Sequence, residues 1–214
     1  MNGPSTQIPS REQIFRLISS FSVAGKEAQA EMERNLLRDY PSFTALLCAQ
    51  QKDSQTILRK SVSLSVLCAV LKELAHRYGR ALLPEGNLME QPELLRDYLM
   101  VHMARERVEQ FRLLFLDEKN CLIRDELQSR GTINHVSVYP REVAKRCLEL
   151  KAERLIMVHN HPAGQTMPSR ADVVMTQHIE TALKVIDVVL VDHFIITRKA
   201  QTSFRQLGLL AEQF

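Results

Sequence analysis

The sequence predicts a layered α/β or α+β fold in which a mixed sheet is backed by helices and is preceded by a small all-helical domain. Strand-like and helix-like segments alternate from about Glu109 onward, which is the pattern of a sheet covered by helices. Before that point the apolar residues recur at helical spacing. The chain of 214 residues, of which 45% are hydrophobic and 25% charged, is long enough for one ordinary domain plus a small one.

The helical part is predicted to span residues 11–103, after a flexible leader at residues 1–10 that is rich in Ser, Pro, Asn and Gly. Apolar spacing and strong helix formers predict three helices, at residues 11–21, 26–40 and 53–79. The second helix is expected to stop before Pro41 and the third on Gly79, because proline and glycine are common helix stops. One more helix is expected after a connector.

Residues 104–214 are predicted to form the sheet-containing domain, which begins with strands. The segment "QFRLLFLDEKNCLIRDEL" indicates two strands around a turn at residues 117–120, because apolar runs flank a short polar stretch. A third strand is expected in "GTINHVSVY", residues 131–139. Pro140 then begins a helix, since proline is favoured in the first helical turn.

The remaining residues predict another strand, a helix and a final extended segment. The apolar run "AERLIMV" indicates a buried strand that ends at His159. After a polar turn, a helix is expected at residues 169–184. The final segment "DVVLVDHFIIT" indicates either two short strands or one bent strand, so strands and helices interleave throughout the second half.

Composition and charge exclude several classes of protein. The four cysteines lie far apart without a C-x-x-C pair, which argues against a disulfide framework and predicts reduced thiols in a cytoplasmic protein. No stretch of 18 apolar residues predicts a membrane span, and "MNGPSTQIPSREQ" lacks the apolar core of a signal peptide. The net charge of +3 forms no basic stripe, so charge neither supports nor excludes DNA binding.

The stretch "RLIMVHNHPAGQTMPSRAD" holds the polar residues that point most directly to chemistry. Residues i and i+2 of a strand share a face, so His159 and His161 can aim at one point while Asn160 looks away. The Pro/Gly turn and a helix start at Ser169 can bring Asp172 back toward both rings. Two His and one Asp leave a tetrahedral Zn²⁺ one open position, as in catalytic sites.

Each part of this pattern also has an ordinary structural explanation. Ser169 and Asp172 match the Ser-x-x-Asp capping box of a helix start. Either histidine of an isolated H-x-H pair can simply form hydrogen bonds within a loop. The joint pattern H-x-H-P-x-G-x-x-x-P-S-x-x-D combines a strand end, a turn and a helix start at fixed spacing, and this combination favours the metal site.

H-x-H followed by seven residues, Ser, two residues and Asp resembles the signature of the JAMM (MPN+) metal-dependent hydrolases. The wider context, with "FLDEKN", "GTINHVSVYPREVAKRCLEL", "HNHPAG" and "VDHFII", is similar to the RadC family over about residues 104–211. The resemblance implies a JAMM-type α/β/α fold that holds Zn²⁺ on His159, His161 and Asp172.

A hydrolase of this type also needs a glutamate from an earlier strand, which takes a proton from the attacking water and hands it to the leaving nitrogen. The candidates are Glu106, Glu109 and Glu118. In RadC-like sequences the acid lies two residues before the aromatic residue that opens the first strand, and Phe111 therefore selects Glu109. Ser169 would assist by hydrogen bonding to the water or to the developing oxyanion.

Three further histidines receive weaker interpretations. The pair Asp192-His193 matches a RadC-like "DH", which leaves open whether it orients a metal ligand or forms a satisfied pair in the core. His135 and His178 match no motif and are interpreted as surface or structural residues.

The resemblance implies a zinc-dependent JAMM-type hydrolase that cuts a peptide or isopeptide bond in a protein or peptide substrate. The sequence itself adds a cytoplasmic location and no membrane partner. RadC-like proteins also carry a DNA-repair label and often begin with a helical domain that resembles a helix-hairpin-helix. Residues 11–107 hold only Gly25, Gly79 and Gly86, none in a G-x-G hairpin, which argues against DNA binding by this half. A module for protein interaction or for homodimer formation is the other interpretation of these helices. A DNA-repair-associated, nucleic-acid-binding protein and a metal-bearing scaffold without activity are the alternatives.

Overall fold

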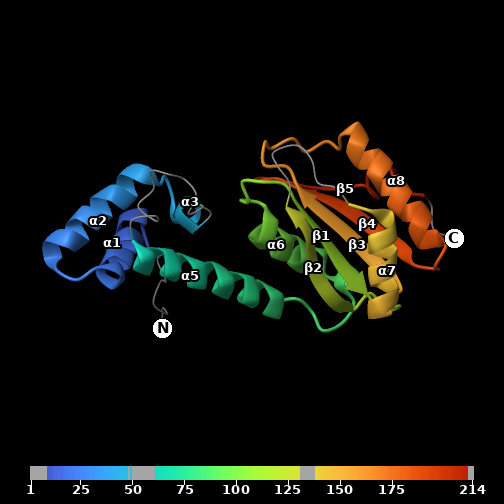
Figure 1. Cartoon of the computed structure of the whole chain (residues 1–214), viewed down its shortest axis with the longest axis horizontal. Coiled ribbons are helices and arrows are strands. Elements are labelled where there is room, and N and C mark those ends of the chain that lie inside the picture. The colour runs from blue at the N-terminus through green and yellow to red at the C-terminus, as the bar shows by residue number, and fades with distance from the viewer. Residues whose placement is uncertain (1–8, 48, 50–60, 131–137, 212–214) are drawn as a thin grey trace, which may run out of the picture. The chain divides into compact units, whose positions relative to one another are not determined.

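The computed structural model describes most of the chain, which divides into two compact units, Met1–Ala75 and His76–Phe214 (Figure 1). The described residues are 9–47, 49, 61–130 and 138–211. Predictions for three segments lie outside them: residues 1–8, 53–60 and 131–137. The last of these segments includes His135 and most of the expected third strand.

The first unit is a helical bundle around a small apolar core, which confirms the predicted helical N-terminal half. The helices among its described residues are α1 (Arg11–Ser22), α2 (Lys26–Asp39), α3 (Phe43–Leu47) and the first part of α5 (Val62–Ala81). The buried side chains that form its core are Phe15, Ile18, Met32, Leu36, Tyr40, Leu46, Leu64 and Cys68. Among the described helices of either unit, none combines the length and the apolar character needed to cross a membrane.

Helix α5 ends later than the sequence predicts. The prediction that it stops on Gly79 is wrong, because the helix continues to Ala81. A helix tolerates one interior glycine at a cost of about 1 kcal/mol, and Gly79 does not take the positive φ of a helix cap. This turn packs against α6 (Pro92–Met103), where a Cβ on Gly79 would lie 3.8 Å from the side chains of Tyr98 and Val101.

Five strands of the described residues form a mixed sheet at the centre of the second unit. Its strands are β1 (Gln110–Leu116), β2 (Leu122–Arg130), β3 (Arg154–Asn160), β4 (Val189–Ile196) and β5 (Gln201–Ser203). They lie in the order β2-β1-β3-β4-β5, with β3 and β4 parallel and the other neighbours antiparallel. The predicted mixed sheet is confirmed, and "DVVLVDHFIIT" forms a single strand.

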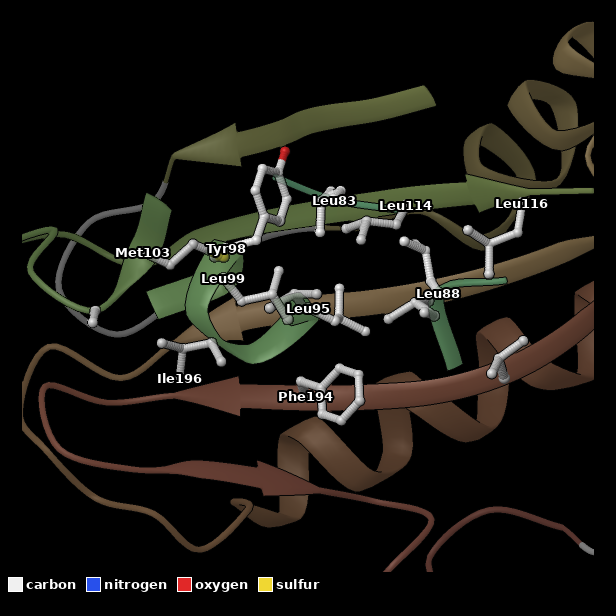
Figure 2. Close-up of a cluster of buried hydrophobic side chains, with 14 residues drawn as sticks. Leu83, Leu88, Leu95, Tyr98, Leu99, Met103, Leu114, Leu116, Phe194 and Ile196 are labelled. Atoms are coloured by element: carbon white, nitrogen blue, oxygen red, sulfur yellow. The ribbon is translucent and has the colours of Figure 1, made fainter. Parts of the chain in front are cut away.

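Helices cover both faces of this sheet, so the predicted α/β/α arrangement is confirmed (Figure 1). One face packs against α6, and Figure 2 shows Leu95, Tyr98 and Leu99 of that helix beside Leu114 and Phe194 of the sheet. The other face packs against α7 (Pro140–Leu150) and α8 (Arg170–Lys184). The core therefore lies in two apolar layers, one on each side of the sheet.

Helix α6 belongs to the sheet-containing unit, whereas the predicted helical domain extends to residue 103 and includes it. Its apolar face covers sheet residues that water would otherwise reach, and full burial of one such side chain is worth about 1.5–3 kcal/mol. The boundary between the compact units lies instead within α5, between Ala75 and His76.

The packing of α6 predicts unequal effects for two substitutions on the same helix. Leu99 is fully buried, so Leu99→Ala is expected to lower the free energy of unfolding by about 2–5 kcal/mol. Val101 is 52% exposed, and Val101→Ala is expected to change that free energy by less than about 0.5 kcal/mol. Urea unfolding measures both values, and equal small losses would contradict the proposed packing of α6 on the sheet.

Candidate metal centre

Strand β3 places His159 on the side of the sheet that faces α8. Leu155 and Met157 belong to the apolar layer under α7 and α8, and the alternation of a strand puts His159 on that same face. His161 follows the strand and stays in line with it, because its backbone N–H donates to the Ile196 carbonyl at 2.9 Å. The backbone of both histidines is therefore fixed by hydrogen bonds within the sheet.

Helix α8 brings the carboxylate to these rings. Ser169 is its N-cap residue, and the predicted capping box is present: Asp172 N–H donates to Ser169 Oγ at 3.2 Å, and Ser169 N–H donates to Asp172 Oδ2 at 2.7 Å. The same carboxylate also faces the histidines, with Oδ1 3.3 Å from His159 Nε2 and Oδ2 3.5 Å from His161 Nε2. Capping the helix and facing the histidines are therefore compatible.

The three side chains form a compact group of potential ligands. His159 Nε2 and His161 Nε2 are 2.9 Å apart, and every ligand atom of the group lies within 4.8 Å of the others. Ligand atoms around a tetrahedral Zn²⁺ lie about 3.3 Å apart when each is 2.0–2.1 Å from the metal. The two imidazole nitrogens are 2.9 Å apart, and each lies 3.3 or 3.5 Å from a different oxygen of the Asp172 carboxylate. These separations are close to that value, so the residue types and their spacing suit a zinc ion.

The protonation of the group also suits a cation. His161 Nδ1 lies 2.8 Å from the Gln165 carbonyl, which can only accept, so this nitrogen carries the proton and Nε2 is left for another partner. Burial would raise the pKa of the Asp172 carboxyl, but the neighbouring imidazoles of His159 and His161 and the hydroxyl of Ser169 outweigh this effect and hold the pKa well below its ordinary value. Asp172 in turn raises the pKa of His161. The group therefore presents a carboxylate anion beside imidazole nitrogens.

A cavity of about 590 Å³ opens beside the three side chains, and Glu109 contributes to its wall. Glu109 directly precedes β1, in which Phe111 pairs with His159 of β3. Its charge helps to raise the pKa of His161, after the larger effect of the Asp172 hydrogen bond. Glu109 therefore stands near the candidate ligands without belonging to the three-residue group.

The other two candidate glutamates lie elsewhere. Glu118 is in the turn after β1, at the end of that strand opposite Phe111. Glu106 accepts a hydrogen bond from Gln110 Nε2 at 2.7 Å and is not part of the cavity wall. Of the three candidates, only Glu109 borders the cavity.

Most of the remaining cavity wall is apolar. His178, predicted to be a surface or structural residue, is exposed and borders the cavity. The other residues of the wall, beyond those already placed, are Val138, Tyr139, Pro140, Pro162, Ala163, Gln165, Ala171, Val174 and Met175, together with Phe111 and Ser169. A substrate would therefore meet a polar end at the histidines and largely apolar sides.

Asn160 lies between the two histidines in the sequence and holds the backbone on both sides of Glu109. Its side chain is 1% exposed and lies on the opposite face of the sheet. Its Oδ1 accepts from Gln110 N–H at 2.7 Å, and its Nδ2 donates to the carbonyls of Val108, at 3.1 Å, and Glu106, at 3.4 Å. The middle residue of H-N-H thus fixes the segment that carries Glu109 to the strand that carries the histidines.

Asn160→Ala tests this role of the amide. Loss of the acceptor leaves the buried Gln110 N–H unpaired, at a cost of about 1–3 kcal/mol, so its protection from hydrogen exchange should fall by about tenfold to a hundredfold. Exchange at Leu114, in the middle of β1, serves as the internal control and should stay nearly unchanged. Unaltered protection of Gln110 would show that the side chain does not hold this segment.

The pair Asp192-His193 separates into two roles. His193 Nε2 lies 2.7 Å from His159 Nδ1, so it touches a candidate ligand. Asp192 instead accepts from Ser203 Oγ at 2.5 Å and from the Arg205 and His193 backbone amides at 3.0 and 2.7 Å. The two residues of the pair therefore do not share a contact between their side chains: His193 meets His159, and Asp192 is satisfied by Ser203 and by backbone amides.

Comparison with known proteins gives a consistent picture. A family model described as "RadC-like JAB domain" matches residues 89–209, a span that includes α6. The UPF0758 protein SPO0054 of Ruegeria pomeroyi is 38% identical over 210 residues, which cover 98% of this chain and 93% of that protein. A UPF0758 protein of Rhodobacter capsulatus is 37% identical over 210 residues, covering 98% of this chain and 97% of that protein.

Proposed function

The chain belongs to the RadC-like JAB domain family, and on this premise we propose that it is a zinc-dependent hydrolase of a peptide or isopeptide bond. One observation carries the proposal: His159, His161 and Asp172 converge with the separations of zinc ligands at a cavity that Glu109 also borders. Three protein ligands leave a tetrahedral zinc one further position, which catalytic sites use for water or substrate.

Zinc bound at this site would act as a Lewis acid that acidifies a water molecule and polarises the substrate carbonyl. Glu109 would take a proton from the water as its oxygen attacks the carbonyl carbon. The same carboxyl group would then give the proton to the nitrogen of the breaking C–N bond, so that an acid and an amine leave. Asn160 would keep Glu109 in place through the hydrogen bonds to its flanking backbone.

Ser169 has a more specific role in this proposal than the sequence alone suggests. Its hydroxyl donates to Asp172 Oδ2 at 2.7 Å and accepts from Asp172 N–H at 3.2 Å. It therefore orients the carboxylate, and stabilising the oxyanion would require the hydroxyl to turn from Asp172 toward the substrate. We propose that Ser169 orients the Asp172 carboxylate in the resting protein and stabilises the oxyanion during the reaction.

We further propose a protein or peptide substrate and a cytoplasmic location. Cys68, Cys121 and Cys147 are free thiols, and burial raises the pKa of Cys68 to about 11 and that of Cys147 to about 12, which keeps both thiols protonated and unreactive. Free thiols suit a reducing compartment. DNA binding and a homodimer stay predictions.

Incubation of the zinc-loaded protein with defined peptide and isopeptide libraries tests the proposed function. Mass spectrometry of the products should reveal new carboxyl and amino termini. A chelator such as 1,10-phenanthroline should abolish the cleavage, and added zinc should restore it. Cleavage that persists after the metal has been removed would contradict a zinc-dependent reaction.

A further inference from the structure

A line of hydrogen-bonded groups leads from the backbone of α8 through the core to His159. Thr176 Oγ donates to the Asp172 backbone carbonyl at 2.6 Å and lies 2.7 Å from His193 Nδ1. His193 Nε2 in turn lies 2.7 Å from His159 Nδ1. This line ends at the nitrogen of His159 that points away from His161 and Asp172.

The chemistry of each group sets the direction of every hydrogen bond in the line. The single hydroxyl proton of Thr176 goes to a carbonyl, which can only accept. Toward His193 the hydroxyl oxygen therefore accepts, and His193 Nδ1 carries the proton. His193 is fully buried between a hydroxyl and another imidazole, where the neutral ring with a single N–H is the stable form.

The position of the proton on His193 determines the tautomer of His159 at the proposed metal site. Because His193 has its proton on Nδ1, its Nε2 accepts, and His159 Nδ1–H must donate to it. A neutral His159 then has its lone pair on Nε2, the atom that faces His161 Nε2 at 2.9 Å. In the opposite tautomer the proton would sit on Nε2 and point at Asp172 Oδ1, 3.3 Å away, where it would occupy the metal-binding position.

We propose that His193, held by Thr176, is a positioning residue that keeps His159 in the tautomer able to bind zinc; this inference rests on the proposed function. The carboxylate of Asp172 attracts a proton to His159 Nε2, and the acceptor on His193 opposes it by holding the proton on the far nitrogen. The metal site thereby stays ready for a cation before one arrives.

The surroundings of His193 support this role. Its ring stacks on Phe204, with centroids 4.4 Å apart, and meets the edge of Phe111 at 5.8 Å. These contacts prevent the ring from turning away. The neighbouring carboxylate of Asp192 is engaged with Ser203 and backbone amides and so does not compete for the imidazole.

Two variants of His193 separate the acceptor from simple packing. His193→Phe keeps an aromatic ring between its neighbours but removes the acceptor, whereas the side-chain carbonyl of His193→Gln can take the place of Nε2. We expect zinc affinity, measured by chelator competition, to fall about 10-fold to 100-fold in the phenylalanine variant and to recover in the glutamine variant. The visible absorption of the Co²⁺-loaded protein should change and recover in the same order.

A milder pair at Thr176 keeps the test decisive if His193→Phe does not fold. Thr176→Val removes the hydroxyl acceptor and frees His193 to place its proton on Nε2, whereas Thr176→Ser retains the hydroxyl. We expect weaker zinc binding in the valine variant only. Wild-type affinity in folded His193→Phe or Thr176→Val, or equal losses in the phenylalanine and glutamine variants, would overturn the positioning role. A wild-type protein that binds no zinc would instead overturn the proposed function on which it rests.

Discussion

Glu109→Gln is expected to lower the rate of hydrolysis by about a hundredfold to ten-thousandfold while the zinc content stays at the wild-type level. Glutamine keeps the size of the side chain and its place in the cavity wall but cannot accept a proton from water. Glu109 is not part of the group of three potential ligands, so its loss leaves that group intact. The measurements are kcat/KM on a cleaved peptide and the zinc content of the same preparation.

Glu118→Gln is the matched control for this experiment. It makes the same chemical change to a glutamate that the sequence also allows as the base, but in the turn at the far end of β1. Its activity and zinc content should equal those of the wild type. An active Glu109→Gln variant, or a loss confined to Glu118→Gln, would show that the base is assigned to the wrong residue.

His161→Ala is expected to remove zinc from the protein. Its zinc affinity should fall by more than the roughly 10-fold to 100-fold that is typical when a residue hydrogen-bonded to a metal ligand is replaced. The change deletes one of three proposed ligands and leaves His159 with a single carboxylate partner. It also deletes the hydrogen bond from Nδ1 to Gln165, which helps to order the turn after β3. Chelator competition on purified protein gives the affinity directly.

His178→Ala serves as the control, because this histidine also borders the cavity but lies outside the group of three. Its zinc affinity should match that of the wild type. Both variants should keep the circular dichroism of the native protein, since His161 follows a strand that is fixed by its neighbours. Undiminished zinc binding by folded His161→Ala would remove His161 from the site.

Local patterns in the sequence are sufficient to predict the convergence of the three proposed ligands. The alternation of a strand puts His159 and His161 on one face, and a turn followed by a helix start returns Asp172 to them. The capping box and the facing of the histidines were alternatives in the sequence, and the structure shows both in the same carboxylate. The arrangement of the three proposed ligands therefore follows mostly from the geometry of neighbouring segments of the chain.

The local sequence does not predict on which face of the sheet His193 lies. Leu190 of β4 faces α8, and strict alternation from it would send Asp192, not His193, to that face. A register irregularity at Leu155/Ile156, where β3 pairs with β4, shifts the alternation by one residue. Such a bulge depends on how two strands that are distant in the sequence pair, so the local sequence of β4 does not predict it.

The role of Asn160 and the placement of α6 depend likewise on distant partners. Alternation predicts that Asn160 points away from the histidines, but its partner Gln110 is 50 residues away in the chain. The apolar spacing of α6 predicts a helix and an apolar face, but not which core that face joins. The helix covers the sheet through residues such as Leu99, so the compact unit begins before the predicted boundary at residue 104.

Metal analysis of the wild-type protein tests the central claim most directly. Purified without added zinc and washed free of loosely bound ions, the protein should contain about one zinc ion per chain by inductively coupled plasma mass spectrometry. Well-folded protein that holds no zinc, and takes up none when zinc is supplied, would contradict the claim and leave Asp172 with the capping of α8 as its function.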